Sequence, residues 1–297
     1  MSTRRQFIKQ SSITSLAALA APSLLLKPSY PLGLQLYTLH KEMQTDLEGT
    51  LKKIASFGYK EVETYGFNYG PIKNYWNMEA TTLKKILDAN GLKSVSGHYH
   101  LDKFLLPGKT PDDLKRYVDE CIAGALELGQ AYIVWPYLDE SLRSINQFKL
   151  VASTLNIIGE QIKKANLQLA YHNHHFEFID YNGQTGYDII LNETDSNLVK
   201  IELDIYWFTH SSKLPAHYYF SKYPKRFPLL HLKDMDKNNR ELHTVMGDGV
   251  IDFSPYLADA ELAGVKHLLV EQGNNYVPNA LDCVQRSASF VKNNLLR

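Results

Sequence analysis

Three histidines and a glutamate stand within the short stretch LAYHNHHFEF, residues 169–178, directly after an apolar run. Side chains in a strand alternate in direction, so His172 and His174 share one face while Asn173 and His175 share the other. Imidazole is a common metal ligand, and it also titrates near neutral pH. The stretch therefore indicates either a metal site or a polar strand end.

Three further ionisable residues follow or end strand-like runs later in the chain. Asp204 stands in VKIELDIYW, His231 in FPLLHLKD and Glu271 in VKHLLVEQG. If these runs are neighbouring parallel strands, their carboxyl ends meet at one edge, where the three side chains would converge with His172. Two imidazoles and two carboxylates suit a borderline divalent ion such as Zn²⁺, Mn²⁺ or Co²⁺, and Mg²⁺ is left open. We therefore predict one divalent ion held by His172, Asp204, His231 and Glu271.

Structural roles are the alternatives for the same residues. A single histidine in such a position is more often a hydrogen-bonded structural group than a ligand. Asp204 is placed where a helix cap is expected, and Glu271 has Lys233 as a candidate ion-pair partner. Four such residues on successive strands nevertheless favour the metal site.

The elements that must position these residues alternate regularly from residue 31 onward. Short apolar runs are followed by amphipathic, helix-like stretches. The runs predicted to be strands are 32–39, 61–66, 92–100, 131–138, 167–175, 199–207, 227–234 and 265–273. These strand-then-helix units predict the α/β class and a single (β/α)8 TIM barrel. An open doubly wound sheet would require a glycine-rich turn after the first strand, and YTLHKEM offers none.

The predicted helices are best marked where capping residues flank them. Thr110 is expected as an N-cap, Pro111 as the first helical residue and Gly129 as the end of one long helix. Other helices are predicted over 46–57, 78–90, 144–165 and 280–296.

Active sites of such barrels form at the carboxyl ends of the strands, so polar and aromatic residues there are candidates for chemistry. His98 ends the third strand-like run and is the candidate acid or base beside Glu271. Glu177, in the loop after the fifth run, is expected to contact substrate, and aromatic rings there can stack on a sugar face. The remaining residues predicted to bind substrate are Glu63, His100, Trp135, His174, Trp207, Lys233 and His243.

The first 29 residues have the pattern of an export signal. TRRQFIK, residues 3–9, carries a pair of arginines and precedes SSITSLAALAAPSLLL, an uncharged stretch rich in alanine, leucine and serine. This pattern is typical of a twin-arginine (Tat) signal peptide, with a retained membrane anchor as the alternative. We expect a signal at 1–29, a barrel domain at 30–297, a periplasmic location and no stable membrane span after signal removal.

The amino-acid composition limits the classes of molecule that the protein is expected to bind. The 32 basic residues balance the 32 acidic ones, so no overall positive field is available to hold nucleic acid. Cys121 and Cys283 are too few and too far apart in sequence for a disulfide framework, and we expect buried thiols. A small-molecule partner is expected, and a homo-oligomer is left open.

Four motifs, in this order and spacing, resemble the xylose isomerase-like TIM-barrel superfamily of sugar phosphate isomerases, epimerases and apurinic endonucleases. They are IELDIYW with Asp204, LLHLKD with His231, HTVMGDGVIDF at 243–253, and LLVEQ with Glu271. The resemblance covers residues 31–297 and implies one divalent metal at the barrel mouth, with Asp204, His231 and Glu271 as ligands. The chain departs from the epimerases on the fifth strand, because His172 stands where they have a glutamate that is both ligand and acid/base.

The resemblance implies an enzyme that moves a proton next to a metal-polarised carbonyl of a sugar. An isomerase or epimerase is the leading expectation, with Glu271 and His98 as catalytic residues. A lyase that eliminates the aglycone from 3-keto-glycosides is the first alternative, because it needs only one good base. An apurinic-endonuclease-like phosphodiesterase, with Glu241 and His243 as extra ligands, and a non-catalytic sugar-binding protein are the others.

Overall fold

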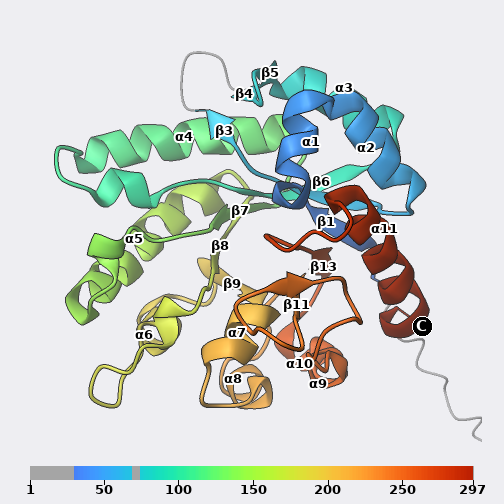
Figure 1. Cartoon of the computed structure of the whole chain (residues 1–297). Coiled ribbons are helices and arrows are strands. Elements are labelled where there is room, and N and C mark those ends of the chain that lie inside the picture. The colour runs from blue at the N-terminus through green and yellow to red at the C-terminus, as the bar shows by residue number, and fades with distance from the viewer. Residues whose placement is uncertain (1–29, 69–73, 297) are drawn as a thin grey trace, which may run out of the picture.

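The computed structural model of the chain describes residues 30–68 and 74–296. Eight parallel strands close into a barrel in the order β1-β13-β10-β9-β8-β7-β6-β2, and helices surround it (Figure 1). The barrel closes where β1 pairs with both β2 and β13. The predicted (β/α)8 barrel is therefore confirmed.

Each of the eight barrel strands lies within a run predicted from the sequence. The strands are β1 (Leu32–Gln35), β2 (Glu61–Thr64), β6 (Lys93–His98), β7 (Tyr132–Trp135), β8 (Gln168–His172), β9 (Val199–Asp204), β10 (Leu229–Leu232) and β13 (His267–Val270). Most are shorter than their apolar runs, because the residues after each strand turn into loops or short helices at the barrel mouth. His100 and His174 consequently lie in loops rather than in strands.

The helices form the outer ring. They are α1 (His40–Thr45), α2 (Leu47–Ser56), α3 (Ala80–Ala89), α4 (Pro111–Leu128), α5 (Ile145–Lys164), α6 (Gly186–Glu193), α7 (Ile205–Ser211), α8 (Ala216–Lys222), α9 (Ser254–Ala258), α10 (Ala260–Ala263) and α11 (Ala280–Phe290). The predicted caps of α4 are confirmed: Thr110 and Asp113 form a reciprocal capping box, and Gly129 ends the helix at φ 75°. The predicted helix over 280–296 is regular only to Phe290, and Val291–Leu295 continue as a π-helix.

Small sheets lie outside the barrel. Strands β3 (Phe67–Asn68), β4 (Asn74–Tyr75) and β5 (Met78–Glu79) form one, and β11 (Asp234–Met235) and β12 (His243–Thr244) form another. The second sheet directly follows β10 in sequence, so it extends that strand beyond the barrel and brings His243 back toward its mouth.

Apolar packing occupies two separate zones. The larger one joins the outer faces of the strands to the helices and includes Trp135 and Tyr171. A small cluster inside the barrel contains Val134, Ala170 and Leu229. Because side chains two residues apart share a strand face, this inner cluster is the floor on which His172 and His231 stand. Polar groups therefore begin one layer above an apolar plug.

The predicted export signal, residues 1–29, lies outside the described residues. Across 30–68 and 74–296, every helix is too short or too polar to span a membrane. Cys121 and Cys283 are free and buried, as predicted.

Candidate metal centre

The four predicted ligands come from neighbouring strands and meet at the barrel mouth. His172 ends β8, Asp204 ends β9, His231 lies in β10, and Glu271 directly follows β13. His172 Nε2 is 3.7 Å from Asp204 Oδ2, and His231 Nδ1 is 2.8 Å from Glu271 Oε2. Ligand atoms of Asp204, His231 and Glu271 all lie within 4.8 Å of one another. The structure thus brings Asp204, His231 and Glu271 together in one group, with His172 beside Asp204.

A deeper layer of two carboxylates orients the two imidazoles. Glu202 Oε2 lies 2.9 Å from His172 Nδ1, and Glu63 Oε1 lies 2.8 Å from His231 Nε2. Both glutamates are fully buried, and Gln35 donates a hydrogen bond to Glu63 at 2.7 Å. A carboxylate on one ring nitrogen fixes the tautomer and turns the other nitrogen toward a metal position. His172 Nε2 and His231 Nδ1 are the nitrogens that remain on the side of Asp204 and Glu271.

His98 bridges the two deep carboxylates. Its Nε2 is 2.9 Å from both Glu63 Oε1 and Glu202 Oε2. Burial lowers the pKa of His98, but the two carboxylates outweigh burial and raise this pKa to about 9. The charged imidazolium is therefore favoured at neutral pH. Such a ring cannot accept a proton, so the position does not support His98 as a base.

The same side chains offer a second grouping of ligand atoms. His98, His172, Glu202 and His231 also place one ligand atom each within 4.8 Å of the others. His231 belongs to both groups. The two groupings differ in which carboxylates would bind an ion, Glu202 in the deep group or Asp204 and Glu271 at the mouth.

Lys233 occupies the space between the two mouth carboxylates. Its Nζ is 2.7 Å from Asp204 Oδ2 and 2.8 Å from Glu271 Oε2. Burial lowers the pKa of Lys233, but both carboxylates raise it above its usual value. The pKa of Glu271, which burial raises, is brought well below its usual value by Lys233 and His231. The alternative role predicted for Glu271, as a partner of Lys233, is therefore present together with the ligand geometry.

Asp204 also fulfils its alternative role. Its Oδ1 accepts a hydrogen bond from Trp207 N at 2.9 Å and caps α7, so only Oδ2 faces the mouth. Asn173 Oδ1 accepts from Asp204 N at 3.1 Å and fixes the end of β9 against the loop after β8. The cap and the amide hold the carboxylate in place without using the oxygen that faces Lys233.

A buried aspartate shapes the loop that carries His243. The Asp234 carboxylate accepts hydrogen bonds from the backbone nitrogens of Met235, Gly247, Gly249 and Ile251 at 2.8–3.2 Å. A Cβ at Gly249 would lie 2.2 Å from Asp234 Oδ1. The glycines of HTVMGDGVIDF are therefore required so that the backbone can wrap around this carboxylate.

Aromatic and imidazole rings build one wall of the mouth. His174 stacks on Phe176 at 5.5 Å between ring centroids, and Trp207 lies 5.8 Å from His174 and 6.2 Å from His243. His174 Nδ1 is buried and has no hydrogen-bond partner within the described residues. His243 Nδ1 accepts from Gly273 N at 2.7 Å, and burial lowers the pKa of His243 to about 3. Both histidines are thus neutral groups beside the ligands.

Several residues predicted to bind substrate have other positions. Trp135 is fully buried in the outer apolar zone, and Glu63 is buried in the deep layer, so neither is open to a substrate. Glu177 is also fully buried, where it accepts hydrogen bonds from Tyr171 Oη and His174 N. His100 is about half exposed in the loop after β6, 3.9 Å from Asp102. These predictions took nearness to a strand end as evidence of exposure, which does not follow.

Two residues of the centre, Glu202 and Gln35, are absent from the predicted site residues. Glu202 is two residues before Asp204 on β9 and therefore shares its inward face. Gln35 is the last residue of β1 and is fully buried. Alternation counted back from Asp204 would have found Glu202, whereas no signal in the sequence marks Gln35.

The extra ligands of the phosphodiesterase alternative do not join the centre. Glu241 is exposed and its carboxylate lies 2.9 Å from His210 Nε2, while His243 binds Gly273 N. Within residues 30–68 and 74–296, neither residue is part of a group of possible metal ligands.

Comparison with known proteins identifies the family and the relatives that the chain resembles. A model of the family described as xylose isomerase-like TIM barrel matches residues 51–292. The chain is 24% identical over 265 residues to an inosose dehydratase of Clostridium perfringens, with 78% of this chain and 87% of that relative covered. The related proteins are enzymes, so the prediction that this chain is an enzyme is confirmed.

Two solved structures have the same fold. A sugar phosphate isomerase/epimerase from Parabacteroides distasonis is 25% identical with a TM-score of 0.76, covering 96% of this chain and 99% of that one. A protein named IolI, whose crystal structure contains a bound zinc atom, is 15% identical with a TM-score of 0.66, covering 88% and 96%. The resemblance inferred from the strand motifs is confirmed.

Proposed function

We propose, since the chain belongs to the xylose isomerase-like TIM barrel family, that it is a metal-dependent enzyme that moves a proton at the carbon next to a carbonyl of a sugar. One observation carries the proposal. His172 and His231 each turn one nitrogen to a buried carboxylate and the other toward Asp204 and Glu271. This is the arrangement in which imidazoles bind a metal ion beside carboxylate ligands.

The charges of the centre suit a divalent cation. Four carboxylates, those of Glu63, Glu202, Asp204 and Glu271, lie in contact with one lysine and the imidazoles. Glu63 Oε2 and Glu202 Oε1 are buried without a hydrogen-bond partner in the described residues, so negative charge remains uncompensated. The residues fit an ion held by His172, Asp204, His231 and Glu271. When bound, that ion would polarise a carbonyl or hydroxyl oxygen of the substrate.

The chain's own side chains would move the proton. Glu271 is 10% exposed, and its carboxylate is held by His231 and Lys233 at the mouth. His174 is a second candidate, because its Nδ1 is free of protein partners in the described residues and can accept a proton. We assign the role of the base, which the sequence predicted for His98, to Glu271 or His174. His98 is then the cation that binds the carboxylates of Glu63 and Glu202.

A sugar without a phosphate group is the substrate class that the mouth favours. Lys233, the basic residue predicted at the mouth, forms ion pairs with Asp204 and Glu271. Trp207 offers a ring, which would stack on an apolar sugar face. Isomerisation or epimerisation is the leading reaction.

Elimination is the second candidate reaction, and a specific observation favours it. His172 replaces the carboxylate that a two-base epimerase would need, and elimination from a 3-keto-glycoside needs one good base. The similarity to an inosose dehydratase, a protein named for the elimination of water, supports the same choice.

Proton exchange and metal content test the proposal together. The mature protein would be incubated in deuterium oxide with ketoses and with 3-keto-glycosides. We expect deuterium at the carbon next to the carbonyl, with a released aglycone only if the reaction is elimination. Elemental analysis should find about one divalent ion per chain in the wild type and much less in Asp204→Ala. Equal metal in both proteins, or no exchange with any sugar, would overturn the proposal.

We also propose export to the periplasm through the Tat pathway, from the arginine pair Arg4 and Arg5 and the uncharged stretch after it. Replacing both arginines by lysine should retain the precursor in the cytoplasm, as measured by cell fractionation. A normal periplasmic yield of the double variant would contradict this route.

A further inference from the structure

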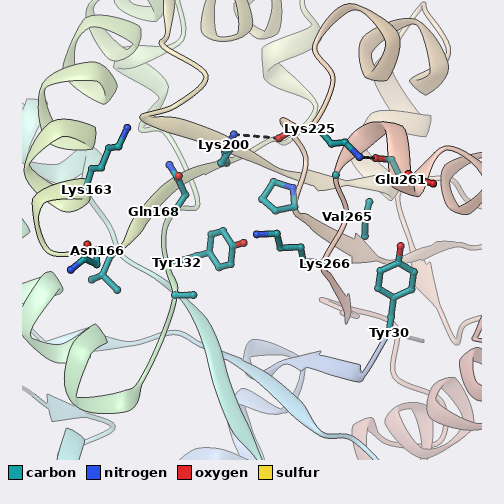
Figure 2. A pocket seen from close by; sticks show the side chains of 14 residues that line it. Tyr30, Tyr132, Lys163, Asn166, Gln168, Lys200, Lys225, Glu261, Val265 and Lys266 are labelled. Carbon is teal, nitrogen blue, oxygen red and sulfur yellow. Dashed lines mark hydrogen bonds between the residues drawn. The ribbon is translucent and has the colours of Figure 1, made fainter. Parts of the chain in front are cut away.

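A cavity opens at the end of the barrel opposite the candidate metal centre. Its volume is about 850 Å³, and the amino-terminal ends of β7, β8 and β9 line it together with the segments that lead into β10 and β13 (Figure 2). Lys266 precedes β13, whereas Glu271 follows it. At about 3.3 Å per residue along a strand, the two ends lie roughly 16 Å apart. The cavity is therefore separate from the catalytic mouth.

Four lysines surround this cavity, and they come from four different segments. Lys163 lies in the last turn of α5, Lys200 in β9, Lys225 after α8 and Lys266 before β13. Glu261 is the single acidic residue of the lining. The lining thus has an excess of positive charge, which an anion would neutralise.

The four ammonium groups lack acidic partners. Among the described residues, the lysines that form ion pairs are Lys84, Lys213 and Lys233, none of which lines the cavity. Lys200 and Lys225 donate only to backbone carbonyls, those of Lys225 and Glu261 respectively. A hydrogen bond to a carbonyl oxygen does not neutralise the positive charge of either lysine.

The deep side of the cavity adds a further positive charge, which Asp195 offsets in part. Arg226 is buried behind Lys200, and its guanidinium binds the carbonyls of Leu191 and Val199 and the Thr194 hydroxyl. Burial, followed by Arg226 and Lys266, lowers the pKa of Lys200. Like charges that lower the pKa of a lysine in this way destabilise one another, and this cost falls when an anion binds.

Tyr132 supplies a neutral floor. Its ring is nearly buried and packs against His267 at 5.6 Å, and burial raises the pKa of its hydroxyl to about 12. In Figure 2 the ammonium end of Lys266 extends toward the Tyr132 side chain, and Gln168 and Lys200 are seen above that ring. A ligand ring could pack on the phenol while its acidic groups reach the lysines.

From this geometry we propose that the amino-terminal cavity of the barrel is a binding site for a small polyanion carrying two or more carboxylate, sulfate or phosphate groups. The site is independent of the reaction at the mouth. Its ligand would stabilise the fold by cancelling the repulsion among Lys163, Lys200, Lys225 and Lys266.

Calorimetric titration of the metal-loaded protein at constant ionic strength tests the proposal. The probes are benzene-1,3-dicarboxylate, benzene-1,3-disulfonate and phenyl phosphate, which bind metals weakly and distinguish the three acidic groups. Benzoate is the singly charged control. We expect saturable binding of at least one dianion and weaker binding of benzoate.

Variants locate the binding. Lys200→Met keeps the apolar stem of the side chain, and Lys266→Gln changes an exposed residue, so both should fold. A lost hydrogen bond to a charged group corresponds to about a tenfold or larger loss of affinity for Lys200→Met, and about threefold for the more exposed Lys266→Gln. The matched control is Lys149→Gln, which changes an exposed lysine of the same helix as Lys163 but outside the cavity. It should bind like the wild type.

Three results would each overturn the proposal, the first two being as follows. One is the absence of saturable binding for all three dianions. The other is an equal loss of affinity in Lys149→Gln, which would show that the anion responds to overall charge and not to this cavity. Dianion binding that survives unchanged in Lys200→Met would place the ligand elsewhere and have the same consequence.

Discussion

Replacing Glu202 by glutamine is the sharpest test of how the centre is organised. Glu202 Oε2 accepts hydrogen bonds from His172 Nδ1 and His98 Nε2, each at 2.9 Å. Glutamine has the same shape but no charge, so the His172 contact becomes a neutral hydrogen bond and the contact from the cationic His98 is no longer an ion pair. Bonds to a charged group contribute about 1.5–3 kcal/mol and neutral ones about 0.5–1.5 kcal/mol, so each contact weakens by roughly 1 kcal/mol.

The expected consequence is weaker binding of the metal ion at the mouth. Two weakened contacts sum to about 2 kcal/mol, which corresponds to a loss of metal affinity of roughly 30-fold. This lies within the 10 to 100-fold range typical for residues that orient metal ligands. Competition with a fluorescent zinc chelator would measure the affinity, and circular dichroism would verify the fold.

The chain offers a matched control for this change. Glu61 also binds a histidine inside the same barrel, with His267 Nδ1 at 2.8 Å, but at the amino-terminal end. Glu61→Gln should leave metal affinity unchanged. Equal loss in Glu61→Gln and Glu202→Gln, or no loss in either, would refute the orienting role.

The same assay separates the two groupings of ligands. If Asp204 is a ligand and Glu202 only orients His172, Asp204→Asn should lose more affinity than Glu202→Gln. The reverse order would place the ion in the deep group of His98, His172, Glu202 and His231.

Three further predictions address the fold and the ion. Gly249→Ala should destabilise the protein by about 1–3 kcal/mol in urea unfolding, because its Cβ would meet Asp234 Oδ1 at 2.2 Å; an unchanged midpoint would contradict that packing. Thr110→Ala removes the hydroxyl that accepts from Asp113 N and should lower stability by about 1 kcal/mol, seen as a lower melting temperature. Chelation should lower the melting temperature and added Zn²⁺ or Mn²⁺ should restore it, whereas insensitivity to both would argue against a bound ion.

The barrel could be predicted because the alternation of strands and helices is visible in short stretches of the sequence. Every strand has an apolar run that the sequence shows directly, and the caps of α4 depend on Thr110, Pro111 and Gly129 alone. The mouth ligands followed from the same local information, since Asp204 and Glu271 each stand at the end of such a run. These predictions needed no knowledge of how one strand is placed against the next.

The direction and depth of other side chains depend on register between strands, which a single sequence does not contain. Trp135 pairs with Tyr171, and both point outward, while Val134 points into the barrel. Glu63 pairs with Gln35 and Ser96, which sets it one layer below the mouth. Nearness to the end of a strand is therefore no guide to exposure, because His231 and Trp135 are both fully buried, His231 against the carboxylates of the mouth and Trp135 in the outer apolar zone.

The replacement of a glutamate by His172 is best understood together with Glu202. An imidazole at the end of β8 keeps a ligand atom but brings no negative charge, and it needs a partner on its second nitrogen to fix its direction. Glu202, one strand over and one layer down, supplies both the charge and the partner at 2.9 Å. The carboxylate count near the ion is thus maintained, but the charge sits below the ligands, where it cannot reach a substrate carbon. In the proposed function, such a centre would retain metal affinity while giving up one of the two bases of an epimerase, which is why proton removal followed by elimination should be tested alongside epimerisation.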